Sequence, residues 1–113
     1  MPTINPSLRE LQALLVKQHS DLNRKLDDVT DAKVARAIVR EMQEITHRIT
    51  LVGQLLFAKQ SAKLKEAVGA VKTAAAKVQQ AIQKFANVQA LLDATTDLLT
   101  LVDDAIDLAK TLA

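Results

Sequence analysis

Two histidines and a few acidic residues are the candidates for metal or acid–base chemistry in this sequence. Glu44 and His47 have the E-x-x-H spacing that di-iron helical bundles use. Such a site needs two copies of the motif and two further glutamates, whereas this chain has one copy. By helical phase both side chains point away from the apolar stripe of their segment, so we expect Glu44 to pair with Arg40 or Arg48. His19 lies at the edge of another apolar stripe, where it is expected to be partly buried.

The chain lacks the residue types on which most other active sites depend. It has no Cys and only two Gly, which excludes a thiolate site and a Gly-rich phosphate-binding loop. No G-x-S-x-G motif is present. Glu41 lies closer to the expected core than the other acids of its segment, and Arg48 is its expected neighbour. We therefore expect a protein that is not an enzyme and that holds no metal or cofactor.

Two neighbouring segments of opposite charge are the most distinctive feature of the sequence. Residues 61–88 contain five Lys and one Glu, whereas residues 89–113 contain five Asp and one Lys. The lysines flank the apolar stripe of their own segment on both sides. The aspartates lie on the side of their segment opposite its apolar stripe. The candidate basic surface consists of Lys63, Lys65, Lys72, Lys77 and Lys84. The candidate acidic docking stripe consists of Asp93, Asp97, Asp103, Asp104 and Asp107.

Each charged segment has a structural and a functional interpretation. Lysine stems often cover the margin of a core while their ammonium groups remain in water. The same pattern is typical of a helix that lies on an anionic lipid surface. Nucleic acid is a weaker alternative, because the basic segment has no Arg and only Phe85 for stacking. The aspartates form either a solvated face or a docking stripe for a basic partner, and Lys72 is expected to meet Asp103 if the two segments are adjacent.

The composition predicts an all-α protein. Of the 113 residues, 49% are apolar, with Leu and Ala dominating, and both are strong helix formers. Two Gly and two Pro are too few to form the turns of a β-fold. The length suits one domain, residues 1–113, because two halves would each be too small to bury a core.

The direction of the apolar side chains predicts where helices end. Each helical residue turns the side-chain direction by about 100°, and the apolar stripe before residue 29 differs by roughly 145° from the next one. We therefore expect a turn near residues 29–31, with Thr30 as the N-cap. A second large change predicts a break near residues 86–88, with Asn87 as the left-handed residue that ends a helix. Ser7 and Glu10 fit a capping box at the first helix.

The predicted helices cover about residues 6–28, 31–59, 62–86 and 89–112. Their similar lengths and short connections predict an antiparallel up-down bundle of four helices. The phase does not decide whether residues 59–62 form a turn capped by Ser61. The alternative is a single helix over residues 31–86, giving a long coiled-coil hairpin completed by oligomerisation.

The sequence favours a function in protein–protein association. Several apolar residues lie off the centre of their stripes, and the candidate interface consists of Leu51, Phe57, Leu101 and Leu108. A homo-oligomer subunit, an adaptor and a neutralising partner of another protein all fit. The alternative is a membrane-active protein that uses the basic helix 62–86 on an anionic surface. No signal peptide or membrane span is recognisable, so a cytoplasmic location is expected, with export by a signal-less route left open.

Overall fold

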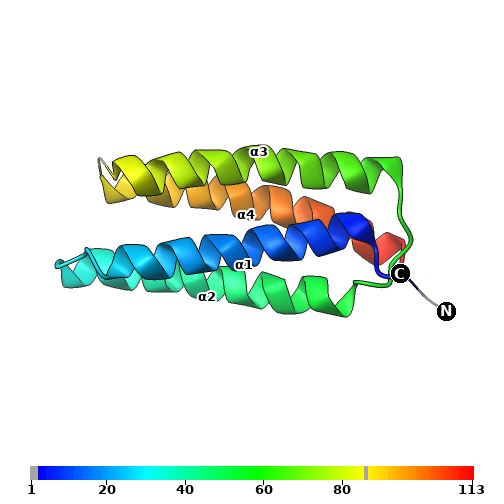
Figure 1. Ribbon diagram of the computed structural model, residues 1–113, viewed down its shortest axis with the longest axis horizontal. Coiled ribbons are helices and arrows are strands. Elements are labelled where there is room, and N and C mark those ends of the chain that lie inside the picture. Colours follow the sequence, from blue (N-terminus) through cyan, green and yellow to red (C-terminus); the bar gives the residue numbers. More distant parts are fainter. Residues whose placement is uncertain (1–2, 86) are drawn as a thin grey trace.

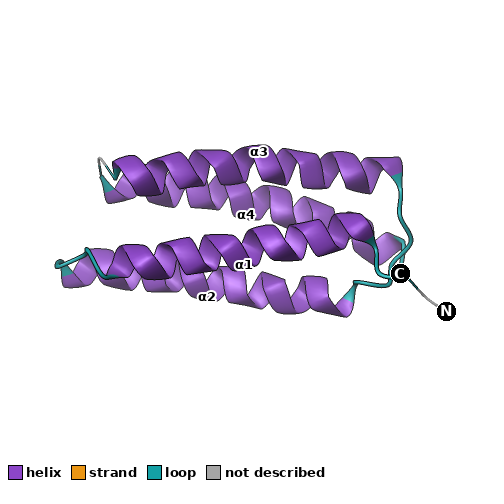
Figure 2. Cartoon of the chain, in the orientation of Figure 1, coloured by secondary structure: helices purple, strands orange, loops and turns teal. Residues whose placement is uncertain are grey.

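Four α-helices run back and forth along one long axis (Figure 1). The computed structural model describes residues 3–85 and 87–113. The helices are α1 (Pro6–Leu26), α2 (Ala32–Gln54), α3 (Ala62–Lys84) and α4 (Val88–Thr111). They hold 83% of this part of the chain, which contains no strand (Figure 2). The predicted four-helix bundle is confirmed, and the alternative of one helix over residues 31–86 is wrong, because the chain turns between α2 and α3.

The neighbours in the bundle do not follow the order of the chain. α1 contacts α2 and α3, and α4 contacts the same two helices. The consecutive helices α2 and α3 therefore lie diagonally opposite each other. Two antiparallel hairpins, α1–α2 and α3–α4, pack side by side, so that α1 lies beside α3 with the same direction and α2 lies likewise beside α4 (Figure 1).

Each helix buries one apolar face in a common core. In α2 the fully buried positions Ile38, Ile45 and Val52 recur every seven residues, which keeps them on one side of the helix. Burying one such side chain contributes about 1.5–3 kcal/mol. The largest fully buried side chains are Leu8, Leu11, Leu15, Leu22, Ile38, Ile45, Leu64, Leu91, Leu98, Val52, Val71 and Val78. They belong to the stripes that predicted the helices.

Asn, Asp and Ser side chains begin the four helices. Asn5, Asp31, Ser61 and Asn87 are the N-caps, and each accepts a hydrogen bond from a backbone N–H of the first helical turn. The turn capped by Ser61, which the apolar phase left open, is therefore present. The prediction for Thr30 is wrong by one residue, because the carboxylate of Asp31 takes this position.

The capping box expected at Ser7 is also wrong. Asn5 Oδ1 accepts hydrogen bonds from Ser7 N–H (3.0 Å) and Leu8 N–H (3.1 Å), so Ser7 lies inside the helix. The Ser7 hydroxyl instead accepts a hydrogen bond of 2.6 Å from Gln60 Nε2. This contact attaches the start of α1 to the connection between α2 and α3.

The turn between α3 and α4 differs in detail from the prediction. Phe85 has the left-handed conformation (φ 38°) that was expected of Asn87, and Asn87 is extended and caps α4. A left-handed conformation is uncommon for an aromatic residue. Here the Phe85 ring packs against the core, and Lys25 Nζ of α1 lies 4.3 Å from its centroid.

Residues 55–61, the α2–α3 linker, are bound to both ends of the described chain. Asn5 N–H donates to Leu56 O (2.7 Å), and Asn5 Nδ2 donates to Ala58 O (3.0 Å). Lys59 N–H donates to Leu112 O (3.1 Å). These bonds explain why α2 ends at Gln54, five residues before the predicted end, although the apolar pattern continues beyond it.

Candidate functional site

The α3–α4 hairpin carries a groove on its solvent side, which we call the α3–α4 groove. Its volume is about 420 Å³. The residues that line it are Ala70, Thr73, Ala74 and Lys77 of α3, with Ala94, Asp97 and Leu101 of α4. The groove therefore unites one residue from each predicted set: the basic surface, the acidic stripe and the candidate interface.

Small side chains create this groove. Ala70 and Ala74 are one helical turn apart on α3, and Ala94 lies across from them on α4. Ala74 is buried where the two helices meet, whereas Ala70 is exposed. Leu101 is half-buried and packs against the core. The result is an apolar floor that another helix can approach closely, because no long side chain rises from it.

Charged side chains stand on the two sides of the groove. Lys77 and Asp97 are both exposed. Within residues 3–85 and 87–113, neither of them takes part in an ion pair. The groove thus has one cationic and one anionic side, each available to an external partner.

The other residues of the predicted basic surface do not gather around one point. Lys63, Lys65, Lys72 and Lys84 are all exposed. Lys65 and Lys72 border a hollow beside α1, on a different side of α3 from Lys77. Lys72 Nζ lies 3.6 Å from Glu10 Oε1 of α1. The expected contact between Lys72 and Asp103 is therefore wrong, because Lys72 turns towards α1.

The acidic stripe is partly engaged within the bundle. Asp93, Asp104 and Asp107 are exposed, whereas Asp103 is half-buried and bound by Arg48 of α2. Arg48 Nε donates to Asp103 Oδ1 (2.8 Å) and Nη2 donates to Oδ2 (3.0 Å), which makes a bidentate pair. This bonding raises the pKa of Arg48 above its usual value.

Glu44 of the E-x-x-H motif is bound by an arginine of its own helix. Glu44 Oε2 accepts a hydrogen bond of 2.9 Å from Arg48 Nη1, which confirms the expected ion pair. In the described part of the chain, no three His, Asp or Glu side chains cluster as metal ligands would. His19 and His47 border a hollow of about 410 Å³ between α1 and α2, where Val39 and Met42 are apolar neighbours.

The surroundings of Glu41 shift the pKa of its side chain. Burial raises the pKa of its carboxyl group above 4.5, and the charge of Glu44 raises it further. Arg48 and Arg40 act in the opposite direction but do not compensate. The guanidinium of Arg48, the expected partner, is committed to Asp103 and Glu44.

The candidate interface residues fall into two groups. Leu51, Leu101 and Leu108 are half-buried and pack against the core, so they are less available than the sequence suggested. Phe57, in contrast, is 62% exposed. Ile4, which was not among the predicted interface residues, is also exposed, at 39%. Both apolar side chains lie at the end of the bundle where Asn5 binds the α2–α3 linker.

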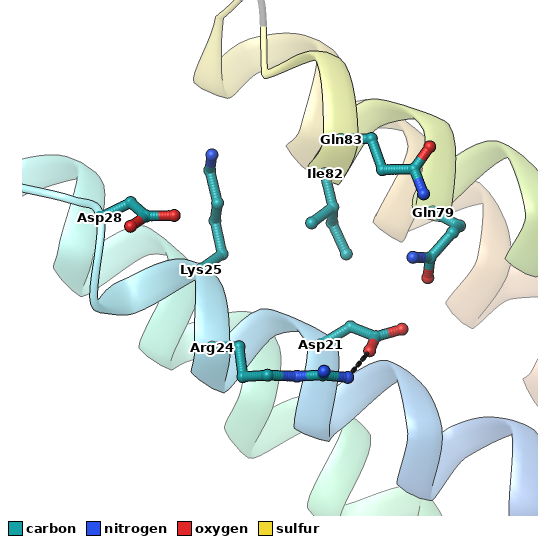
Figure 3. A pocket seen from close by; sticks show the side chains of 7 residues that line it. All are labelled: Asp21, Arg24, Lys25, Asp28, Gln79, Ile82 and Gln83. Atoms are coloured by element: carbon teal, nitrogen blue, oxygen red, sulfur yellow. Dashed lines mark hydrogen bonds and ion pairs between the residues drawn. The ribbon is translucent and has the colours of Figure 1, made fainter.

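Sequence reasoning missed a buried carboxylate beside a hollow of about 330 Å³ between α1 and α3 (Figure 3). Asp21 is only 6% exposed, and it pairs with Lys17 (2.8 Å) and Arg24 (2.6 Å). The spacing of these cations, four residues before and three residues after Asp21, was the available signal. Next to it, buried Gln18 donates from Nε2 to Ala75 O of α3 (3.2 Å). Both cations belong to α1, so the carboxylate is paired within its own helix.

Comparisons with protein-family models, with characterised proteins and with solved structures give no match to this chain. No helix in residues 3–85 and 87–113 has the length and apolar character needed to cross a membrane.

Proposed function

We propose that this chain is a non-enzymatic helical protein that acts through protein–protein association, with the α3–α4 groove as its contact surface. The observation that carries this proposal is an apolar floor of alanines and Leu101 between two exposed and oppositely charged side chains, Lys77 and Asp97. Specific interfaces have this organisation, with an apolar centre and a polar rim.

The groove suits a helix better than a small molecule. Helices pack at distances of about 8–10 Å, and small residues at the contact allow the shortest of these. Ala70 and Ala94 provide that close approach, and Leu101 provides an apolar contact. Lys77 and Asp97 favour a partner with both signs of charge, because complementary charges select the orientation of a partner. A second copy of this chain and another helical protein both meet these requirements. We also propose that the protein is cytoplasmic, as its sequence predicts.

Association at the groove is tested by Ala70→Arg. Ala70 is exposed, so a long charged side chain there obstructs the groove without entering the core. Ala76→Arg is the matched control, because Ala76 is an exposed alanine of the same helix that does not line the groove. We expect light scattering after size exclusion, from about 10 to 500 µM, to give masses above 12.3 kDa for the wild type and for Ala76→Arg. Ala70→Arg should remain near 12.3 kDa. Equal masses for the two variants would contradict the role of the groove.

A second candidate function is binding to an anionic lipid surface through α3. Its five exposed lysines favour this alternative. However, Leu64, Val71 and Val78 of α3 are fully buried, so an apolar contact with lipid requires α3 to leave the bundle. Flotation with vesicles that contain or lack anionic lipid separates the two functions. Binding to anionic vesicles with a mass near 12.3 kDa in solution would favour the lipid surface.

A further inference from the structure

The charges of the α3–α4 hairpin are divided between its two helices. α3 carries five Lys and one Glu, and α4 carries five Asp and one Lys. The two helices are antiparallel neighbours, and at the groove between them α3 contributes the cation Lys77 and α4 the anion Asp97. Lys77 and Asp97 border the same groove, which places them at a similar height along the bundle.

We propose that the α3–α4 face binds the same face of a second copy around a two-fold axis parallel to the helices. Rotation about this axis preserves height along the bundle and exchanges the two sides of the hairpin. Hence α3 of each copy packs on α4 of the other, and Lys77 of one copy faces Asp97 of its partner, twice in the dimer. This inference rests on the proposed function and specifies its partner and geometry.

The charge pattern selects this axis over the other simple arrangement of two facing hairpins. A two-fold axis perpendicular to the helices, in the plane of the interface, places α3 on α3 and α4 on α4. With this axis at the height of the groove, Lys77 faces Lys77 of the second copy and Asp97 faces Asp97, and like charges in an interface are unfavourable. The parallel axis converts the same charges into complementary pairs. A closed, self-complementary dimer of this kind is also the commonest form of homo-oligomer.

The size of the face indicates a weak dimer. Helices of 23 and 24 residues are about 35 Å long, and the bundle is 17 Å across in the corresponding direction. The face therefore measures roughly 600 Å² per copy, below the ~800 Å² per partner of a typical stable complex. We expect a dissociation constant in the micromolar range, and a dimer that weakens as salt screens its charges.

Two single charge reversals test the pairing. Lys77→Asp places two acidic side chains opposite each other at both pair positions of its own dimer, and Asp97→Lys places two basic ones there. Each variant alone should therefore have a dissociation constant at least tenfold above that of the wild type. In an equimolar mixture, the two reversed side chains face each other and the remaining Lys77 and Asp97 form the native pair. The mixture should regain a mass near twice 12.3 kDa.

Lys65→Asp is the matched control, because it changes the net charge by the same amount at an exposed position of α3 beside α1. It should dimerise like the wild type, and circular dichroism should give the same helix content for all variants. If Lys77→Asp and Asp97→Lys each dimerise with the dissociation constant of the wild type, the inference is overturned, and the protein associates through another surface. Monomers in the mixture would also overturn it. A wild type that stays monomeric throughout would overturn both the inference and self-association, leaving a different protein as the partner.

Discussion

The ion pair between Arg48 and Asp103 should stabilise the contact between α2 and α4 by a measurable amount. Its two parallel hydrogen bonds, 2.8 Å and 3.0 Å long, fix the guanidinium against the carboxylate. We expect Arg48→Met, which keeps most of the buried stem, and Asp103→Ala each to lower the free energy of unfolding. The double variant should lose less than the sum of the two single losses, because both remove the same interaction.

The burial of the Arg48 and Asp103 side chains determines how large the coupling energy between them should be. The Arg48 side chain is 14% exposed, whereas that of Asp103 is 50% exposed. Removing Arg48 therefore leaves a carboxylate that water can reach, and the loss of about 3–5 kcal/mol that follows breakage of a fully buried pair does not apply. Fully exposed pairs contribute ~0–1 kcal/mol. Hydrogen bonds to charged groups contribute about 1.5–3 kcal/mol. We expect a coupling energy between these limits, about 1–2 kcal/mol.

Urea unfolding of the wild type, the two single variants and the double variant measures this coupling. The pair of Lys72 and Glu10 is an internal control, because its atoms are 3.6 Å apart and its side chains are 69% and 49% exposed. The cycle of Lys72→Met and Glu10→Ala should give a coupling below about 0.5 kcal/mol. Equal couplings in the two cycles would show that burial and bidentate geometry do not determine the strength of ion pairs in this bundle.

Three further predictions concern the core, a helix cap and a carboxylate. Ile45→Asp should unfold the protein, because it places an unpaired charge at a fully buried position, whereas Asp104→Ala at an exposed position should shift the urea midpoint little. Asn5→Ala should lower the free energy of unfolding by about 1–3 kcal/mol, more than Asp31→Ala, because Asn5 also holds the α2–α3 linker; equal urea midpoints would contradict this. Because the folded protein raises the pKa of Glu41 above 4.5, its ionised form costs stability at neutral pH, so Glu41→Gln should raise the urea midpoint at pH 7. The gain should disappear as the pH falls below 4.5, and a gain that is the same at every pH would show that burial of the ionised carboxylate is not its cause.

The helix breaks were predictable where the apolar face changes direction sharply. The change near Asn87 predicted the third turn correctly, although the left-handed residue is Phe85. The end of α2 was not predictable in the same way. Leu55 and Leu56 continue an apolar pattern, and the helix ends at Gln54 because distant residues bind the linker. Local sequence contains no signal for hydrogen bonds between residues that are more than 50 positions apart.

The members of the candidate site were predictable one by one, but their grouping was not. The sequence identified Lys77, Asp97 and Leu101 in three separate sets, and the packing of α3 on α4 brings them to one groove. The pair of Arg48 and Asp103 depends on the contact between α2 and α4. The phase of the apolar residues fixes the buried face of each helix but not the order of the helices around the core. It therefore could not select Arg48 over Lys72 as the partner of Asp103.

The anchoring of the α2–α3 linker makes the two ends of the bundle unequal in how they open. At one end, Lys59 N–H is bonded to Leu112 O, so its exchange with solvent requires the end of α4 to detach. At the other end, Asp28 N–H is bonded to Lys25 O within the same turn, so fraying of α1 is enough to release it. Local openings expose amides of the second kind far more often. The bundle should therefore loosen first at the turn between α1 and α2, while the anchored end remains protected until the helices separate.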